Sequence, residues 1–237
     1  MDWIRTQQKL AAAGYSPGAV DGLPGRMTYT AIFAHTARRA PDPVLRSIGA
    51  QAAVSLPKYG ISDSPARFAE FLAQTSHETG GFTVFEENMK YSAKRLTQVW
   101  PGRFPTIASA LPFAWDPSDP DREDVELANR VYGGRMGNEL DGTDDDDGWD
   151  HRGGGLLQHT GAGEYAKLKE RLGLTPEQVH TDFAKMVEAA CDYWSRAKVN
   201  TFIDRGDFRG ARKAVNGGFI GVDDVAARRA RALTVLA

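Results

Sequence analysis

The sequence predicts a mainly α-helical protein, and three observations support this. Apolar residues recur at helical spacing after clear helix starts, no stretch alternates apolar and polar residues as a half-buried strand would, and glycine and proline clusters separate the helical stretches. The chain has 237 residues, of which 41% are hydrophobic and 25% charged. That length is sufficient for one full domain and a small additional module.

The first 40 residues have their own pattern. The range Gln7–His35 reads as a short helix, a glycine-rich turn and a second helix, and Ala40–Pro43 (APDP) is a helix-terminating linker. We therefore expect a small helical module at residues 1–40 and a main domain at residues 43–237. The alternative is a helical hairpin that packs on the main domain.

A strongly marked helix follows in the main domain. Ser64–Pro65 is a typical start, since serine caps the first turn and proline fits the first helical position. Gly80–Gly81 ends the helix, because glycine tolerates the left-handed conformation of a C-terminal cap. The last residue of its apolar face is a carboxylate, Glu78, and the other positions on that face are Phe68, Phe71, Leu72 and Thr75.

Two carboxylates stand on either side of this glycine break. We expect Phe82, Val84 and Phe85 to place apolar walls around Glu78 and so to raise its pKa. Glu87 lies in a polar run ahead of a helix that Ser92 can cap, so it should stay ionised. A pair of carboxyl groups with different pKa values is typical of glycosidases. The alternative is a backbone-bonded Glu78 and a solvated Glu87.

The rest of the chain predicts further helices. One begins at Thr175–Pro176 and carries the single cysteine, Cys191, on its apolar face as a packing residue. Arg228 lies in a basic helix at the end of the chain. Between the helices, Pro101–Arg122 has several prolines and no period, which predicts a loop.

Several function classes are disfavoured by composition and spacing. A formal net charge of −2 gives no global attraction to nucleic acid. We expect no metal and no cofactor, because Asp144–Asp147 lacks the calcium-loop order and Gly81 stands where a zinc helix beginning at His77 needs a second histidine. No secretory signal or membrane span is recognisable, which predicts accumulation in the cytoplasm of the producing cell.

A family resemblance begins at HETGG and FEENMKYSAKRL, within Ser76–Leu96. Together these segments resemble the catalytic region of glycoside hydrolase family 19, in particular its bacteriophage endolysin branch. Four later segments resemble successive blocks of that family in the same order: NRVYGGRMGN, DGWDHRGGGLLQHTG, AACDYW and AVNGGFIG. The N-terminal QQKLAAAGY and VDGLPGRMT resemble a peptidoglycan-binding module. The resemblance covers most of the chain and implies a lysozyme-like catalytic domain with a groove between two helical lobes.

The resemblance also implies roles for individual residues. Glu78 would be the general acid and Glu87 the general base of an inverting hydrolysis that needs no metal, with the carboxyl groups about 6.5–9.5 Å apart to admit a water. Thr160 would help to hold that water. The residues that would contact the substrate are His77, Tyr91, Gln158 and Asn216, with Arg228 as a further candidate, and those of the wall-binding module are Tyr15, Asp21 and Arg26.

Some positions depart from the family pattern. Asp150, His151 and Gly154 stand where an aromatic and a basic residue are usual, and Glu164 replaces an asparagine. The arginine expected soon after NGG is missing, although Arg228 lies one helical turn further on. The expected protein is a monomeric endolysin that cuts peptidoglycan after release to the cell wall. A chitinase and a non-catalytic wall-binding protein are the alternatives.

Overall fold

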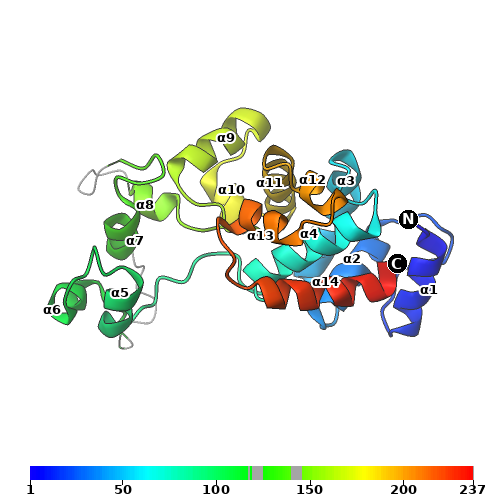
Figure 1. Ribbon diagram of the computed structural model, residues 1–237, viewed down its shortest axis with the longest axis horizontal. Helices are drawn as coiled ribbons and strands as arrows, with labels where there is room; N and C mark the ends of the chain where they lie inside the picture. The colour runs from blue at the N-terminus through cyan, green and yellow to red at the C-terminus, as the bar shows by residue number, and fades with distance from the viewer. Residues whose placement is uncertain (117, 119–124, 140–145, 237) are drawn as a thin grey trace. The chain divides into compact units, whose positions relative to one another are not determined.

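The computed structural model describes residues 1–116, 118, 125–139 and 146–236, and these residues form helices without a named strand (Figure 1). In this part of the chain, extended backbone pairs only at two isolated β-bridges, one between Glu86 and Gly154 and one between Gly154 and His159. The prediction of a mainly α-helical, lysozyme-like fold is confirmed. The helices are α1 (Trp3–Ala12), α2 (Arg26–Ala37), α3 (Pro43–Lys58), α4 (Pro65–Glu78), α5 (Ala93–Val99), α6 (Ile107–Ala110), the 3-10 helix η1 (Leu111–Phe113), α7 (Val125–Tyr132), α8 (Asp147–Asp150), α9 (Ala162–Leu172), α10 (Pro176–Thr181), α11 (Phe183–Arg196), α12 (Val199–Asp204), α13 (Phe208–Asn216) and α14 (Val222–Leu236).

The chain forms two compact units. Unit 1 comprises Met1–Phe85, Gly155–Gln158 and Gln178–Ala237, and unit 2 comprises Glu86–Gly154 and His159–Glu177. Each unit has its own buried apolar cluster. Because unit 1 is assembled from three separate segments, the start and the end of the sequence contribute to one core.

The core of unit 1 is built around α4. Helix α14 packs along α4, as Figure 1 also shows, and α2 and α11 pack on α3. The predicted apolar face of α4 is buried, and Phe71 meets Trp194 of α11 edge to face with ring centroids 5.2 Å apart. Such aromatic pairs add to the stabilisation that comes from buried area alone. Helix α4 is therefore held along its length up to Glu78.

The first 40 residues share this core. Leu10, Ile32 and Phe33 are completely buried in the same cluster as Phe68 of α4, and α1 and α2 both pack on α14. The division between the two units thus does not follow the predicted boundary near Ala40. The helices α1 and α2 pack on the rest of unit 1, and a separate N-terminal module at residues 1–40 stays a prediction. Wall binding by these residues stays a prediction.

The local start and stop signals are confirmed. The Ser64 side chain accepts the backbone N–H of Arg67 at 3.2 Å, and Ser92 accepts that of Arg95 at 3.2 Å. Helix α4 ends at Glu78, and Gly80 and Gly81 follow with φ of +57° and +83°. Left-handed backbone costs a residue with a Cβ roughly 1–2 kcal/mol, so two glycines suit this turn.

Two expectations for the later chain were wrong in detail. The helix predicted to run on from Thr175 is interrupted at Asp182, whose carboxylate caps a new helix by accepting the N–H of Ala184 at 2.8 Å. The range predicted as a loop, Pro101–Arg122, contains α6 and η1, and only part of it lies within the described residues. Thr106 and Ser109 form a reciprocal capping box that starts α6 despite the nearby prolines.

Cys191 is a packing residue, as predicted. Its side chain is completely buried in α11, and burial raises the pKa of the thiol far above its ordinary value. Since the thiolate is the reactive form, this environment makes the cysteine unreactive.

Unit 2 has a smaller core beneath α5, α6 and α7. Its buried members are Met89, Leu96, Phe104, Ala110, Leu127, Ala128 and Val131. Helix α8 approaches α7 closely at Gly148, where a Cβ would lie 2.5 Å from the Cα of Asn129. Only glycine permits this approach, so α7 and the residue at its end, Tyr132, are fixed by the segment that follows.

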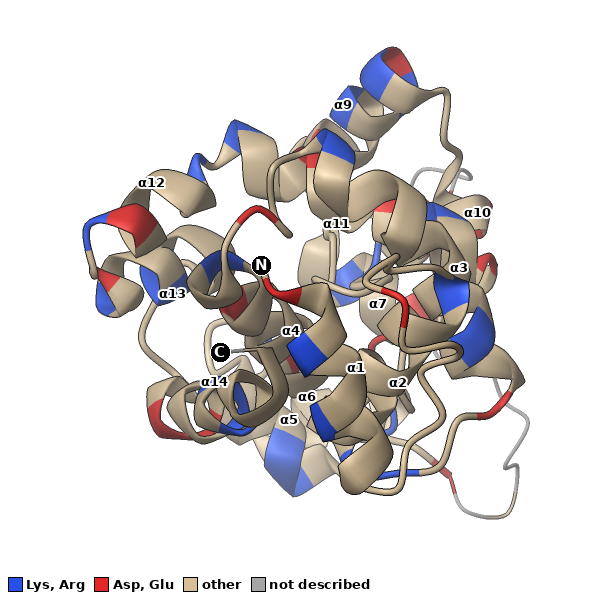
Figure 2. Ribbon diagram, turned by 90° about the vertical axis from the view of Figure 1, so that its right-hand side faces the viewer, with Lys and Arg blue, Asp and Glu red and all other residues tan. Residues whose placement is uncertain are grey.

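The surface of the helices is polar and mixed in charge. Basic and acidic residues both occur on the last helix, α14, as Figure 2 shows. Among the described residues, none of the helices combines the length and apolar character needed to span a bilayer.

Candidate functional site

Glu78 is the last residue of a polar row along α4. Glu70, Gln74 and Glu78 are spaced four residues apart and so share one face of the helix. The Glu70 and Gln74 side chains are completely buried, and Gln74 Nε2 donates to Glu70 Oε1 at 2.8 Å. We call these three residues the α4 polar row. Sequence reasoning missed its first two members because their neighbours are apolar.

Two arginines from other helices pair with this row. Arg212 Nη1, from α13, donates to Glu78 Oε1 at 2.6 Å and to Gln74 Oε1 at 2.7 Å. Its Nε donates to the carbonyl of Ile220 at 2.8 Å, and its side chain is 1% exposed. Arg229 Nη1, from α14, donates to Glu70 Oε2 at 2.8 Å. The buried charges are thus paired along the whole row, as charges in a protein interior must be.

The side chains around Glu78 are not the apolar walls that the sequence predicted. Phe82 packs on Phe33 in the core of unit 1, Phe85 packs on Phe183, and Val84 is 52% exposed. The Arg212 guanidinium instead lies against the Glu78 carboxylate, which keeps 15% of its side-chain surface exposed. Two of the three predicted wall residues, Phe82 and Phe85, thus pack on other aromatic rings of unit 1.

Burial raises the pKa of Glu70, although the hydrogen bonds from Arg229 and Gln74 oppose this. Desolvation therefore outweighs the ion pair at the inner end of the α4 polar row.

Glu87 belongs to unit 2, where a tyrosine holds it. The Tyr132 hydroxyl lies 2.6 Å from Oε1 and 2.5 Å from Oε2 of Glu87. The backbone N–H of Gly153 also donates to Oε2, at 3.3 Å. The neighbouring Glu86 has a different partner, since it pairs with Arg152. Of these two adjacent glutamates, the one predicted to be the base is thus bonded to a phenol rather than to a cation.

Burial raises the pKa of Tyr132 strongly, and the charge of Glu87 raises it further. The phenol therefore stays protonated and can donate to the carboxylate. Tyr132 is the last residue of α7 and was not among the predicted site residues, although it lies in the segment NRVYGGRMGN on which the family resemblance rests. The position of Tyr132 in that segment was the sequence feature that could have identified it as a site residue.

Replacing Tyr132 with phenylalanine tests the predicted role of Glu87 as the base of a glycan hydrolysis. With that role, kcat is expected to fall about tenfold or more, because a hydrogen bond to a charged group is worth roughly 1.5–3 kcal/mol. The measurement is the rate of reducing-end release. The matched control is Tyr193→Phe, since the Tyr193 hydroxyl donates to a backbone carbonyl, that of Ala214, at 3.1 Å. Equal loss of rate in both variants would show that Tyr132 has no special part in holding Glu87.

Tyr91 and Thr160 also belong to unit 2. Tyr91 is half-buried against the Trp100 ring, with centroids 5.0 Å apart. Burial raises the pKa of Tyr91, and the Glu87 carboxylate adds to this effect, which places Tyr91 within the electrostatic field of Glu87. Thr160 is partly buried just before Gly161, the residue that precedes α9.

Gln158, Asn216, His77 and Arg228 belong to unit 1 with Glu78. Gln158 has a positive φ of +53°, and its Nε2 donates to the carbonyl of Gly155 at 3.2 Å. Asn216 is an exposed residue at the end of α13, where Gly217 follows in the left-handed conformation. These features give both residues a structural role, and their contact with substrate stays a prediction.

His77 and Arg228 meet at one carboxylate. Asp224 Oδ2 lies 2.7 Å from His77 Nδ1 and 2.7 Å from Arg228 Nε, and Arg228 Nη1 donates to Ser76 Oγ at 2.7 Å. Gly221 is packed on the histidine ring, since a Cβ there would lie 2.2 Å from Nε2. Asp224 thus links His77 of α4 to Arg228 of α14, and the sequence analysis did not predict this acid as a site residue.

Replacing Asp224 with asparagine is expected to lower the unfolding temperature modestly at pH 7 and by a smaller amount at about pH 3. Burial alone would raise the pKa of Asp224, but the hydrogen bonds and charges of His77 and Arg228 outweigh it and lower the pKa. A carboxyl with a lowered folded pKa stabilises the protein above its unfolded pKa of about 3.9, and this stabilisation is lost as the pH falls. Thermal unfolding at both pH values is the check, and a pH-independent difference would contradict the assignment.

The residues predicted for wall binding have specific places in unit 1. Tyr15 stands edge-on to His35, with ring centroids 5.4 Å apart. Asp21 Oδ1 accepts the backbone N–H of Leu23 at 2.9 Å, which makes Asp21 a turn-forming residue, and this bond is the main cause of its lowered pKa. Arg26 is exposed at the start of α2 and lines a pocket of about 570 Å³ together with Arg46.

Within the described part of the chain, no group of three or more His, Cys, Asp or Glu residues is arranged to hold a metal ion. Asp144 and Asp145, part of the acidic run weighed as a calcium loop, lie outside the described residues.

Comparison with known proteins completes the description. No protein-family model matches the chain. A glycosyl hydrolase family 19 domain-containing protein of Haemophilus influenzae is 34% identical to it over 202 residues, which covers 84% of this chain and 90% of that protein. This similarity agrees with the helical fold. The chain belongs to glycosyl hydrolase family 19.

Proposed function

We propose that the protein is an endolysin that hydrolyses the β-1,4 glycosidic bonds of bacterial peptidoglycan with inversion at the anomeric carbon. Membership of a glycosyl hydrolase family supports the reaction class. The residue assignment is supported by one observation: Glu78 and Glu87 are each held by a donor from a helix distant in the sequence, the Arg212 guanidinium of α13 and the Tyr132 hydroxyl of α7. Catalytic carboxylates need such fixed positions.

In the proposed reaction, Glu78 donates a proton to the glycosidic oxygen as the bond to the anomeric carbon breaks. Glu87 accepts a proton from a water, whose oxygen attacks that carbon from the opposite face. Thr160 orients this water through its hydroxyl. The products are two shorter glycans, one with a new reducing end of inverted configuration, and the proton accepted by Glu87 balances the proton given up by Glu78.

Peptidoglycan is proposed as the substrate because the N-terminal helices resemble a wall-binding module. We further propose that the protein is a monomer, that it binds neither nucleic acid nor membrane stably, and that it is made in a host bacterial cytoplasm before its release to the cell wall. A chitinase would use the same residues on polymers of N-acetylglucosamine. A non-catalytic binder would keep the same helices without turnover.

The purified protein distinguishes these possibilities. Incubation with peptidoglycan and with chitin oligomers, followed by mass spectrometry of the released reducing ends, gives both the substrate and the bond that is cut. Muropeptide release with inverted anomers supports the proposal. Faster cleavage of chitin oligomers would indicate a chitinase. Sedimentation with the wall, without any new reducing end, would indicate a binder.

A further inference from the structure

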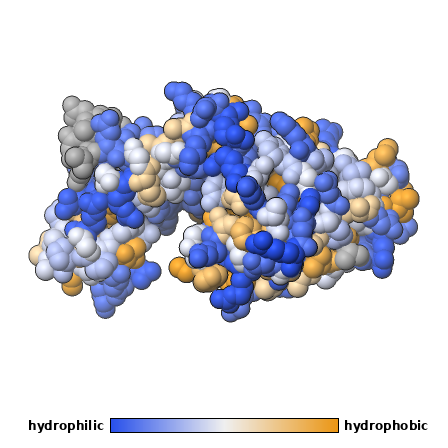
Figure 3. Space-filling view, turned by 45° about the horizontal axis from the view of Figure 1, so that its top comes forward, coloured by the Kyte–Doolittle hydropathy of each residue, from blue (hydrophilic) through white to orange (hydrophobic). Residues whose placement is uncertain are grey.

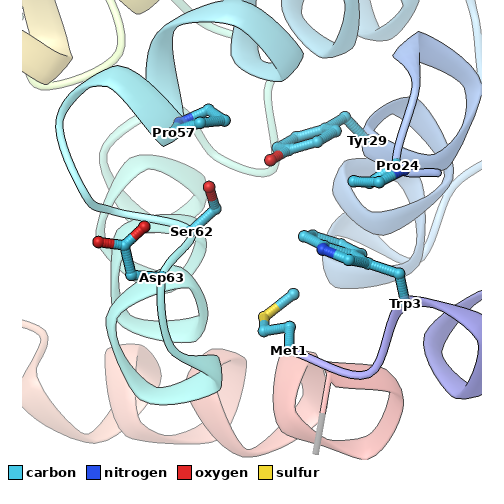
Figure 4. A pocket seen from close by; sticks show the side chains of 7 residues that line it. All are labelled: Met1, Trp3, Pro24, Tyr29, Pro57, Ser62 and Asp63. Atoms are coloured by element: carbon cyan, nitrogen blue, oxygen red, sulfur yellow. The ribbon is translucent and has the colours of Figure 1, made fainter. Parts of the chain in front are cut away.

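Unit 1 contains a pocket whose lining includes none of the residues assigned to hydrolysis. It has a volume of about 480 Å³, within the range of roughly 300–1,000 Å³ typical of small-molecule sites. Figure 4 shows its lining side chains around a common opening, and they come from the N-terminal residue, α1, the turn before α2, α2, α3 and the segment before α4. These residues are Met1, Trp3, Pro24, Tyr29, Pro57, Ser62 and Asp63.

The pocket combines flat apolar surfaces with hydrogen-bonding groups. The partly exposed Trp3 supplies an aromatic ring, which packs on the buried Tyr29 ring at a tilt of 38° with centroids 5.8 Å apart. The Trp3 indole N–H, which faces the opening in Figure 4, has no hydrogen-bond partner among the described residues. Ser62 and Asp63 add a hydroxyl and a carboxylate on the opposite side. Apolar faces with hydroxyl-binding edges match the amphipathic ring of a sugar.

Tyr29 provides a second, independent indication. Its side chain is 1% exposed, and its hydroxyl has no hydrogen-bond partner within the described structure. The Ser62 hydroxyl approaches the Tyr29 hydroxyl and lowers its pKa, although burial raises that pKa more, and the two groups do not reach hydrogen-bond geometry. An unsatisfied buried hydroxyl costs roughly 1–3 kcal/mol, so its presence at a pocket wall calls for an explanation. A ligand hydroxyl bound beside Ser62 would give the Tyr29 hydroxyl the hydrogen-bond partner that it lacks.

The charge of the pocket favours a neutral ligand. Asp63 Oδ2 already lies 3.7 Å from Arg67 Nη1, so its charge is partly compensated. A bound cation would have to compete with that guanidinium. A sugar hydroxyl needs only a lone pair of the carboxylate, which remains accessible because the Asp63 side chain is 63% exposed.

Exposed apolar side chains occur in the same part of the sequence. Ile4, which follows the lining residue Trp3, is 49% exposed, and Leu23, which precedes the lining residue Pro24, is 73% exposed. Figure 3 shows hydrophobic surface at the end of unit 1 that carries α1.

We propose that this pocket binds one sugar of an N-acetylated glycan and is a second carbohydrate site, distinct from the residues that carry out hydrolysis. The choice of an N-acetylated glycan rests on the proposed function. The site would keep the protein on a polymeric substrate between cleavage events, and it would do so through Trp3, Ser62 and Asp63 rather than through Tyr15, Asp21 or Arg26.

The test is a titration of the full chain with tri-N-acetylglucosamine, observed through the indole N–H signal of Trp3 in NMR spectra. The Glu78→Gln variant is used so that the probe is not cleaved. Trp3 is one of five tryptophans, and the loss of its signal in Trp3→Phe assigns it. We expect a saturable shift, at least fivefold weaker binding in Ser62→Ala and Asp63→Asn, and unchanged unfolding temperatures in these variants.

Asp204→Asn is the matched control for Asp63, because Asp204 also pairs with Arg67, at 2.6 Å, but does not line the pocket. No movement of the Trp3 signal up to about 10 mM probe, a concentration that detects even millimolar affinity, would overturn the proposal. So would a shift caused by tetramethylammonium and not by the sugar, or equal weakening by Asp204→Asn. This readout does not require turnover, so a failure of the proposed hydrolysis would be seen separately as absent reducing ends.

Discussion

Replacing Glu78 with glutamine is expected to reduce the rate of glycan hydrolysis by a factor of about 10²–10⁴, the usual contribution of a positioned general acid. Glutamine has nearly the same shape, and its carbonyl oxygen can still accept from Arg212, which now donates to Glu78 Oε1 at 2.6 Å. The substitution therefore removes the transferable proton while the end of α4 is retained. Reducing-end release from peptidoglycan measures the effect.

Glu188→Gln is the matched control for this experiment. Glu188 is also a glutamate of unit 1 with a cationic partner, since Lys185 Nζ lies 3.1 Å from its Oε2, but it belongs to α11 and to no predicted site. We expect this control to keep wild-type activity. A Glu78→Gln protein that is folded and retains more than a tenth of the wild-type rate would refute the assignment of Glu78 as the acid.

Replacing Arg212 with methionine is expected to lower the free energy of unfolding by about 3–5 kcal/mol, the usual cost of removing one partner from a buried ion pair. The 1% exposed arginine serves three acceptors: Glu78, Gln74 and the carbonyl of Ile220. Methionine fills much of the volume but leaves all three without this donor. Urea unfolding of the variant and the wild type gives the difference.

Arg209→Met is the control, because Arg209 lies on the same helix but is exposed and stacks on the Phe219 ring, with 4.6 Å between its guanidinium carbon and the ring centroid. Its loss is expected to cost less than about 1 kcal/mol, as is usual for a surface interaction. If Arg212→Met were no more destabilising than Arg209→Met, the α4 polar row would not depend on its cation. Activity measured in the same Arg212 variant shows how far Glu78 relies on it for position.

The sequence predicted the features that depend on neighbouring residues. Ser64 caps α4 and Gly80–Gly81 ends it, because a cap uses a side chain and an N–H only three positions apart. Asp182 shows the limit of this reasoning. An apolar face that continues through Val179 and Val187 hid a local capping residue that divides one predicted helix into two.

The sequence by itself determined the helical class, the family and the two candidate carboxylates, since these follow from periodicity and from motifs in order along the chain. Only the tertiary structure decided which side chains hydrogen-bond to these two carboxylates. Arg212 is 134 residues from Glu78, and Tyr132 is 45 residues from Glu87. Pairing over such separations depends on how helices pack, and no local pattern encodes it. For the same reason, only packing could show that Leu10 and Phe33 belong to the core around α4.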